Sequence, residues 1–290
     1  MSLFTGAGVA IVTPFDENDN INFDVLEELI EFQIENKIDA IIACGTTGES
    51  VTLSEKEHIS VVKFTVEKVR GRVPVIAGSG SNNTKHAIEL SQECEKVGAN
   101  GLLVVTPYYN KTSQKGLIEH YTAIANSVKI PIIMYNVPSR TGFNMLPKTT
   151  YELSKVNNII GVKECCSNMS QIAEIVNLCG EDFDVYSGND DEILPTLSLG
   201  GKGIISVVAN IIPKEIHDIV ELYMDGNIKK SRELQLKYLK LIKTIFIETN
   251  PIPIKAALNM IGYNVGKGRL PLTTMGEENF KLLQDEVTKI

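Results

Sequence analysis

The stretch Asn158-Ile159-Ile160-Gly161-Val162-Lys163-Glu164 has the pattern of a short buried strand that ends in a lysine. Ile159 to Val162 are apolar or small without alternation, which is typical of a strand covered on both faces. Two interpretations of Lys163 are open at this point. Its stem could pack inside while its ammonium reaches water. Alternatively, the apolar surroundings could lower its pKa and make the amine a Schiff-base nucleophile toward a ketone.

On both sides of this stretch, similar strands alternate with amphipathic helices. Asn22 fits the N-cap of one helix, and Ser54 with Glu57 forms a capping box for another. The strands are predicted at 8–13, 39–44, 73–77, 101–105, 131–135, 159–163, 183–187 and 203–206. The helices are predicted at 22–36, 54–69, 84–97, 114–127, 148–156, 169–179, 190–198 and 213–225.

This alternation implies parallel strands covered by helices, and therefore an α/β fold. A doubly wound sheet would give a similar pattern, but eight regular units in about 220 residues match a (β/α)8 TIM barrel better. The Gly78-Ser79-Gly80 turn lacks the third glycine of a dinucleotide-binding fingerprint. After the barrel only helices are predicted, at 228–247, 253–261 and 276–288. We therefore predict a catalytic barrel over 1–226 and a C-terminal helical extension over 227–290.

Composition excludes several classes of function. A net charge of −8 and a pI near 5.2 disfavour general nucleic-acid binding, which needs a basic face. No stretch is apolar over the length of a membrane span, and the N-terminus lacks the features of a signal peptide. The five cysteines contain no C-x-x-C pair and the four histidines no H-E-x-x-H motif. This pattern indicates reduced thiols, a cytoplasmic location and no metal site.

In a barrel of this kind, functional residues lie at the C-terminal ends of the strands. A lysine, several tyrosines and two threonines fall at these ends although they are far apart in sequence. Each tyrosine alone could be an ordinary rim aromatic, and the Gly-Thr-Thr-Gly loop an ordinary turn, but their conjunction favours a site. The strand ends are Thr46-Thr47, Tyr108-Tyr109, Tyr135-Asn136, Lys163, Ser187-Gly188-Asn189 and Ser206.

Four motifs resemble those of the dihydrodipicolinate synthase (4-hydroxy-tetrahydrodipicolinate synthase) family. They are Gly45-Thr46-Thr47-Gly48-Glu49, Pro107-Tyr108-Tyr109-Asn110-Lys111, Tyr135-Asn136-Val137-Pro138-Ser139-Arg140-Thr141-Gly142 and Gly161-Val162-Lys163-Glu164. The resemblance covers essentially the whole chain. The family belongs with the pyruvate-dependent class I aldolases, which include N-acetylneuraminate lyase, and Arg140 favours the synthase within that group.

The resemblance implies a lyase that condenses pyruvate with L-aspartate 4-semialdehyde in lysine and diaminopimelate biosynthesis. It also implies a cytoplasmic homotetramer built as a dimer of dimers, with no metal and no organic cofactor. Lys163 is then the Schiff-base residue and Tyr135 the acid–base group. Thr47 is expected to link Tyr135 to Tyr109, whose hydroxyl comes from the neighbouring subunit.

The substrate-binding residues implied by the resemblance surround Lys163. Thr46 and Thr47, just ahead of a helix, are expected to bind the pyruvate carboxylate. Arg140 is expected to bind the carboxylate of the aldehyde substrate, and Gly188 and Ile205 to complete the pocket.

Two other interpretations remain. One is a different pyruvate-dependent aldolase, of the 2-keto-3-deoxy sugar acid or sialic acid type, and the other is a non-catalytic barrel. Lysine-sensitive members of the family also have a histidine where this chain has Glu55 and a glutamate where it has His86. We therefore expect weak inhibition by lysine, or none.

Overall fold

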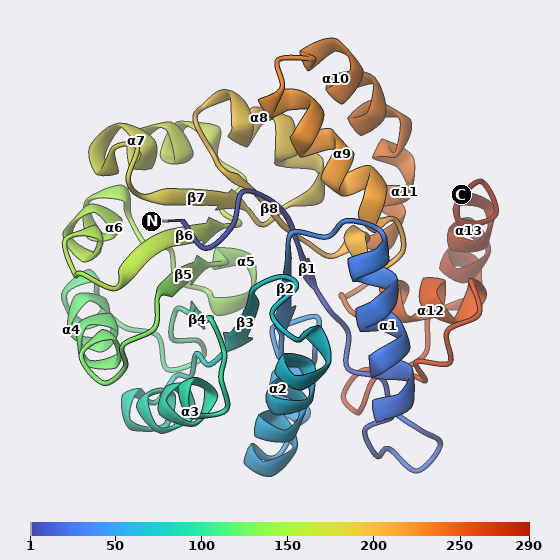
Figure 1. Ribbon diagram of the computed structural model, residues 1–290, viewed down its shortest axis with the longest axis horizontal. Helices are drawn as coiled ribbons and strands as arrows, with labels where there is room; N and C mark the ends of the chain where they lie inside the picture. The colour runs from blue at the N-terminus through green and yellow to red at the C-terminus, as the bar shows by residue number, and fades with distance from the viewer. Residues whose placement is uncertain (1) are drawn as a thin grey trace.

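The computed structural model describes residues 2–290, and in that range eight parallel strands close into one barrel (Figure 1). Each strand pairs with the next along the chain, and β1 pairs with β8 to close the ring. The predicted (β/α)8 TIM barrel is therefore confirmed. The strands are β1 Gly6–Ala10, β2 Ala40–Ala43, β3 Val75–Gly78, β4 Gly101–Val105, β5 Ile132–Asn136, β6 Ile159–Glu164, β7 Asp184–Ser187 and β8 Gly203–Ser206.

Helices surround the barrel, and the last ones lie outside this ring, as the red segments of Figure 1 show. Those of the barrel are α1 Phe23–Glu35, α2 Glu55–Val69, α3 Thr84–Lys96, α4 Gln114–Ala125, α5 Pro138–Thr141, α6 Pro147–Ser154, α7 Met169–Cys179, α8 Ile193–Ser198 and α9 Pro213–Met224. Those after it are α10 Ile228–Lys237, α11 Leu239–Ile245, α12 Ile252–Met260 and α13 Glu277–Val287. Short 3-10 turns occur at Ser50–Thr52, Asp190–Glu192 and Val208–Asn210.

Helix starts follow the polar residues identified in the sequence. The Asn22 side chain accepts a hydrogen bond from the Val25 backbone N–H at 3.2 Å. Ser54 and Glu57 form the complete capping box at the start of α2. Each cap satisfies backbone donors that have no partner within the first turn, which fixes where these helices begin.

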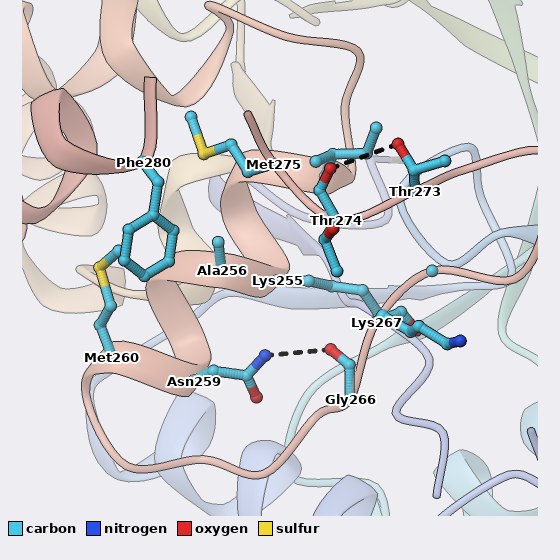
Figure 2. A pocket seen from close by; sticks show the side chains of 12 residues that line it. Lys255, Ala256, Asn259, Met260, Gly266, Lys267, Thr273, Thr274, Met275 and Phe280 are labelled. Atoms are coloured by element: carbon cyan, nitrogen blue, oxygen red, sulfur yellow. Dashed lines mark hydrogen bonds between the residues drawn. The ribbon is translucent and has the colours of Figure 1, made fainter. Parts of the chain in front are cut away.

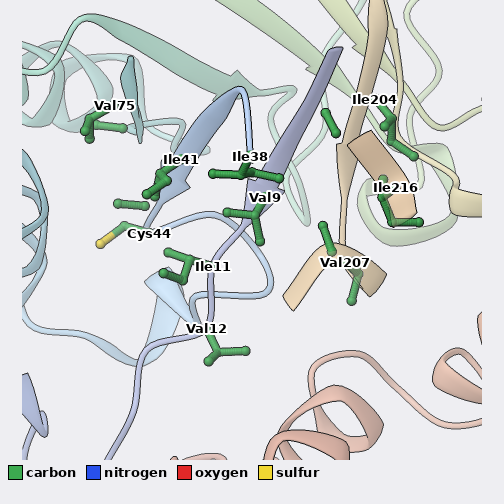
Figure 3. Packing of buried hydrophobic residues seen from close by; sticks show 14 of the residues in the cluster. Val9, Ile11, Val12, Ile38, Ile41, Cys44, Val75, Ile204, Val207 and Ile216 are labelled. Carbon is green, nitrogen blue, oxygen red and sulfur yellow. The ribbon is translucent and has the colours of Figure 1, made fainter. Parts of the chain in front are cut away.

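Two apolar layers hold the barrel together. Alternate strand residues face outward to the helices or inward to the barrel axis, so Ile41 belongs to the outer layer and Ile42 to the inner one. Figure 3 shows part of the outer layer, where Val9, Ile41 and Ile204 extend from neighbouring strands. Because both faces are covered, the strands carry apolar residues without alternation.

The structure corrects three details of the predicted elements. The first strand ends at Ala10, because Val12 N–H leaves the ladder and donates to the Asn210 side chain. The single helix predicted at 228–247 is divided at Tyr238, whose φ and ψ of −94° and 1° are not helical. The short helix α5 was missed, since four residues give no periodic apolar pattern.

Buried polar contacts attach the C-terminal segment to the mouth of the barrel. Lys255 on α12 forms an ion pair of 2.6 Å with Glu49, and both side chains are almost completely buried. Arg269 donates to the carboxylate of Glu57 on α2 and to the Thr52 carbonyl at 2.9 Å. The loop that follows β2 is therefore held from the C-terminal side.

Candidate active site

Lys163 lies at the C-terminal end of β6, beside Tyr135 of β5. The two residues are register partners, and the Lys163 Nζ lies 4.4 Å from the centre of the Tyr135 ring. Only 5% of Lys163 is exposed. Burial is the main cause that lowers the pKa of Lys163, and the Arg140 charge acts in the same direction while Cys165 and Asp190 oppose it. The amine therefore loses its proton more readily than an ordinary lysine.

A cavity of about 170 Å³ opens above Lys163 at the mouth of the barrel. Predicted site residues from four strand ends converge on it, although they are widely separated in sequence. Its polar lining comes mainly from the loops after β2, β5, β6 and β7, with the C-terminal segment closing one side. The lining residues are Ala10, Ile42, Gly45, Thr46, Thr47, Leu103, Tyr135, Val137, Ser139, Arg140, Lys163, Cys165, Gly188, Asn189, Val207, Phe246 and Asn250.

The two threonines of the loop after β2 have different partners. Burial is the main cause that raises the pKa of Tyr135, and hydrogen bonding with the Thr46 side chain acts in the opposite direction. Thr47 is almost fully buried, and its hydroxyl accepts from the Asn250 side chain at 2.9 Å. The link expected from Thr47 to Tyr135 stays a prediction, since the Thr47 hydroxyl contacts Asn250 here. The next α-helix, α2, begins at Glu55 as predicted, and the 3-10 turn Ser50–Thr52 separates its N-terminus from the two threonines.

Gly188 leaves the space that the lysine side chain occupies. A Cβ atom on Gly188 would lie 2.8 Å from Lys163 Cε and 2.0 Å from Cys165 Sγ. Both distances are below van der Waals contact, so a larger residue would displace the lysine or the thiol. The predicted role of Gly188 in the pocket therefore has a steric basis.

Arg140 lies at the end of α5, exposed at the rim of the cavity. It donates a hydrogen bond of 3.0 Å to the backbone carbonyl of Asn250. Asn250 thus contacts both Arg140 and Thr47 from the C-terminal segment. This contact leaves other guanidinium N–H groups available to an anionic ligand.

Two predicted site residues do not line the cavity. Tyr109 is 92% exposed and has a left-handed backbone with φ of 68°. Ile205 is fully buried in the inner layer, and Val207 contacts the cavity in its place. Within one chain, Tyr109 is therefore not brought to Lys163.

Several cavity residues were missed from the sequence, among them Cys165, Phe246 and Asn250. Cys165 follows Lys163 by two positions, and period-two alternation could have placed it on the same side of the strand. Phe246 and Asn250 carry no such signal, because their position depends on how the C-terminal helices pack.

Two buried carboxyl groups lie near the site but outside the cavity lining. Burial raises the pKa of Glu164 to about 7, although Asn136 and Gln171 donate to it. Burial also raises the pKa of Asp190 to about 6, against hydrogen bonds from Ser206 and from backbone N–H groups. Glu164 accepts hydrogen bonds from the side-chain amides of Asn136 on β5 and Gln171 on α7. Asp190 holds the turn after β8.

A larger cavity of about 460 Å³ lies in the C-terminal segment (Figure 2). Its wall is mainly apolar, and Figure 2 shows Phe280 beside Met260 and the hydrogen bond from Asn259 to Gly266. Its one buried charged residue, Lys255, is paired with Glu49. The smaller cavity at Lys163 has the chemical groups of a catalytic site.

A metal centre has little support in the described part of the chain. The one group with suitable donors is His217, Asp218 and Glu221 on α9. His217 Nδ1 is 2.8 Å from Asp39, which precedes β2 and so lies at the opposite end of the barrel from Lys163. Asp218 is paired with Lys214.

No helix within residues 2–290 combines the length and apolarity needed to cross a bilayer.

A (β/α)8 barrel with a buried amine and a phenol at its mouth has the groups that a Schiff-base-forming lyase needs. Residues 3–290 match the Dihydrodipicolinate synthetase family. The chain belongs to that family.

Individual relatives agree with this assignment over the full chain. The 4-hydroxy-tetrahydrodipicolinate synthase of Acetivibrio thermocellus is 60% identical over 282 residues, which cover 97% of this chain and 96% of the relative. The crystal structure of dihydrodipicolinate synthase from Aquifex aeolicus has a TM-score of 0.97 and 45% identity, covering 99% of this chain and 98% of that one. A structure described as the first monomeric variant of the synthase has a TM-score of 0.97 and 44% identity, and the match covers 99% of this chain and 97% of that one.

Proposed function

We propose that the chain condenses pyruvate with L-aspartate 4-semialdehyde to give 4-hydroxy-tetrahydrodipicolinate. The observation that carries this proposal is the buried Lys163 amine beside Tyr135, in a cavity that Arg140 also lines. The 60% identity to a synthase over nearly the whole chain supports it. The product belongs to lysine and diaminopimelate biosynthesis.

The first half of the reaction uses Lys163. Its neutral amine attacks the ketone carbon of pyruvate, and loss of water gives an iminium. The lowered pKa of Lys163 increases the fraction of neutral amine at a given pH. The iminium withdraws electrons from the adjacent methyl group, which loses a proton and becomes an enamine carbon.

Tyr135 is the group proposed to move these protons. Burial keeps the pKa of the Tyr135 hydroxyl well above its ordinary value, so the resting enzyme holds it as a phenol that can donate a proton. The hydrogen bond from Thr46 would stabilise the phenolate formed when Tyr135 gives up that proton. Thr46 is therefore proposed, beside Thr47, for the relay position next to Tyr135.

In the second half, the enamine carbon attacks the aldehyde and the amine of the semialdehyde closes the ring. Ring closure displaces Lys163 and regenerates the free enzyme. Arg140 is proposed to bind the semialdehyde carboxylate through its planar fork. Thr47 and Asn250 would hold the adjacent loop, through their hydrogen bond of 2.9 Å.

The activity is tested by comparing turnover of aspartate semialdehyde with that of sugar-acid aldehydes. The preferred substrate should be aspartate semialdehyde. Replacing Arg140 by Ala should lower kcat/KM for it by roughly 10- to 100-fold, since a hydrogen bond to a charged group contributes roughly 1.5–3 kcal/mol. Pyruvate adduct formation should remain. Preference for a sugar-acid aldehyde would favour the rival aldolase.

A homotetramer built as a dimer of dimers, located in the cytoplasm, also remains a proposal. The exposed Tyr109, outside the cavity of its own chain, supports donation of its hydroxyl to a neighbouring subunit. The five free cysteines support a reducing compartment. Sedimentation with parallel rate measurements on dilution tests the assembly, since dissociated subunits should lose activity.

The proposed division into two domains at residue 226 falls between α9 and α10, and expression of 1–226 alone would test it.

A further inference from the structure

A four-residue turn after β2 carries the two threonines of the candidate site. The Glu49 backbone N–H donates to the Thr46 carbonyl at 3.1 Å, which closes a turn over residues 46–49, here called the threonine turn. Thr46 and Thr47 both line the cavity that we assign to the substrate. The orientation of the threonine turn therefore decides where their N–H and hydroxyl groups point.

Glu49 ends the threonine turn, and the C-terminal segment contacts both oxygens of its carboxylate. Oε1 lies 2.6 Å from the Lys255 Nζ on α12, in a pair whose side chains are 0% and 2% exposed. Oε2 accepts a hydrogen bond of 2.9 Å from the Arg269 backbone N–H. Glu49 also has a left-handed backbone with φ of 56°, a conformation that a non-glycine residue keeps only where its surroundings hold it. The buried carboxylate provides that hold.

The other half of the pair is fixed in turn by its own contacts. The Lys255 Nζ donates to the Lys267 carbonyl at 3.1 Å and lies 4.2 Å from the centre of the Phe15 ring. Asn250, just before α12, donates to the Thr47 hydroxyl at 2.9 Å. The start of α12 therefore contacts the threonine turn at two points, one at a threonine and one at the glutamate.

We propose that Glu49 and Lys255 are positioning residues, whose buried ion pair holds the threonine turn in the orientation that binds the pyruvate carboxylate. The inference rests on the proposed pyruvate chemistry at Lys163. Neither member of the pair lines the substrate cavity, so both act through the turn.

The energetics of buried charges support a positioning role. A buried ion pair contributes little net stability, because the loss of hydration offsets the attraction between the charges. Removal of one partner is costly, since it leaves the other charge buried and unpaired. The pair between Glu49 and Lys255 therefore ties the threonine turn to one place on α12 more than it adds to the free energy of unfolding.

The test measures how the initial rate of borohydride trapping depends on pyruvate concentration, without the aldehyde. In Lys255→Met the Glu49 carboxylate loses its counter-charge, and the turn should leave its position. We expect the half-saturating pyruvate concentration to rise about tenfold, while the trapping rate at saturating pyruvate stays within about twofold of wild type. A fall in the saturated rate with an unchanged half-saturating concentration would overturn the inference.

A double variant separates positioning from stability. Lys255→Met combined with Glu49→Gln removes both charges and keeps side chains of similar length, so no buried charge is left unpaired. The urea midpoint should return toward wild type, whereas the half-saturating pyruvate concentration should stay raised, because neutral partners no longer tie the turn to α12. The double variant also replaces Lys255→Met if that variant does not fold. Recovery of the wild-type pyruvate dependence in the double variant would overturn the inference.

Lys267 provides a matched control in the same segment. Its side chain is exposed, and its contact with Lys255 is made by the backbone carbonyl. Lys267→Met removes a lysine charge without touching the pair, so its half-saturating pyruvate concentration should equal that of wild type. A rise as large as in Lys255→Met would show that the charge of the segment acts, and not the pair. Failure of the wild type to form any adduct would instead refute the proposed function.

Discussion

The Lys163 Nζ lies 4.4 Å from the centre of the Tyr135 ring, so the tyrosine that forms a wall for the amine is also the one whose hydroxyl we propose for proton transfer. An aromatic face favours the ammonium form, whereas burial favours the neutral amine. Burial is the larger effect, and the net result lowers the lysine pKa. Lys163 therefore has a lowered pKa while it stays beside Tyr135, its proposed acid–base partner.

Replacing Tyr135 by Phe separates these two roles. The ring that covers Lys163 remains, while the hydroxyl is lost. We expect kcat to fall by about 10²–10⁴-fold, the usual contribution of a positioned acid–base group, with an unchanged fold by circular dichroism. A variant that retains more than half of the wild-type kcat would show that another group moves the protons.

Replacing Gly188 by Ala tests the steric requirement at Lys163. The added Cβ would lie 2.8 Å from Lys163 Cε and 2.0 Å from Cys165 Sγ. We expect at least a tenfold loss of pyruvate adduct, measured by mass spectrometry after borohydride reduction. Gly276→Ala is a control, since its Cβ would approach only the flexible end of Glu248 at 3.3 Å. Equal adduct formation in both variants would contradict the account.

Acid stability should depend on the pair between Arg269 and Glu57. The hydrogen bond from Arg269 is the main cause that lowers the pKa of Glu57 from 4.5 to about 2. A carboxyl whose pKa is lower in the folded state than in the unfolded state stabilises the protein at pH values above the unfolded-state pKa. This contribution is lost as the pH falls from about 4.5 toward 2.

The corresponding variant is Glu57→Gln. Urea unfolding should show that the free energy of unfolding at pH 7 is lower in the variant by about 1 kcal/mol, given the partial exposure of the pair. Near pH 2 the difference between wild type and variant should largely disappear. A difference that stays constant from pH 7 to pH 2 would show that the charge of Glu57 is not the cause.

Inhibition by free lysine should be weak. Glu55 and His86 line a cavity of about 170 Å³ together with Ser50, Val51, His58 and Tyr108. The Glu55 carboxylate lies 3.4 Å from His86 Nδ1, so a protonated His86 competes with a ligand ammonium for it. Initial rates at subsaturating pyruvate should change little below millimolar lysine. Strong inhibition in that range, lost in Tyr108→Ala, would contradict this prediction.

Local patterns predicted most of the fold. Apolar runs without alternation indicated covered strands, and the residues Asn22 and Ser54 marked helix starts that the structure confirms. The single helix predicted across Tyr238 was wrong, because the break lies within a continuous amphipathic pattern. After the break, α11 packs against α13, and this long-range contact has no signal in the local sequence.

The site was predictable where its residues end strands, as at Tyr135 and Lys163. It was not predictable where long-range packing chooses the partner. Thr46 and Thr47 are adjacent polar residues, and only the position of Asn250 shows that Thr47 is held from the C-terminal segment. Residues such as Asn250 carry no local signal of function.

The measurement that tests the central claim most directly is borohydride reduction in the presence of pyruvate, followed by peptide mass spectrometry. Wild type should carry one pyruvyl adduct, on Lys163, and Lys163→Ala should carry none and lose nearly all turnover while it keeps its fold. Lys255→Ala is not a suitable control, because it would leave the buried Glu49 without its partner, whereas the exposed Lys85 can be replaced. An adduct on another lysine, or near-native turnover in Lys163→Ala, would contradict the account.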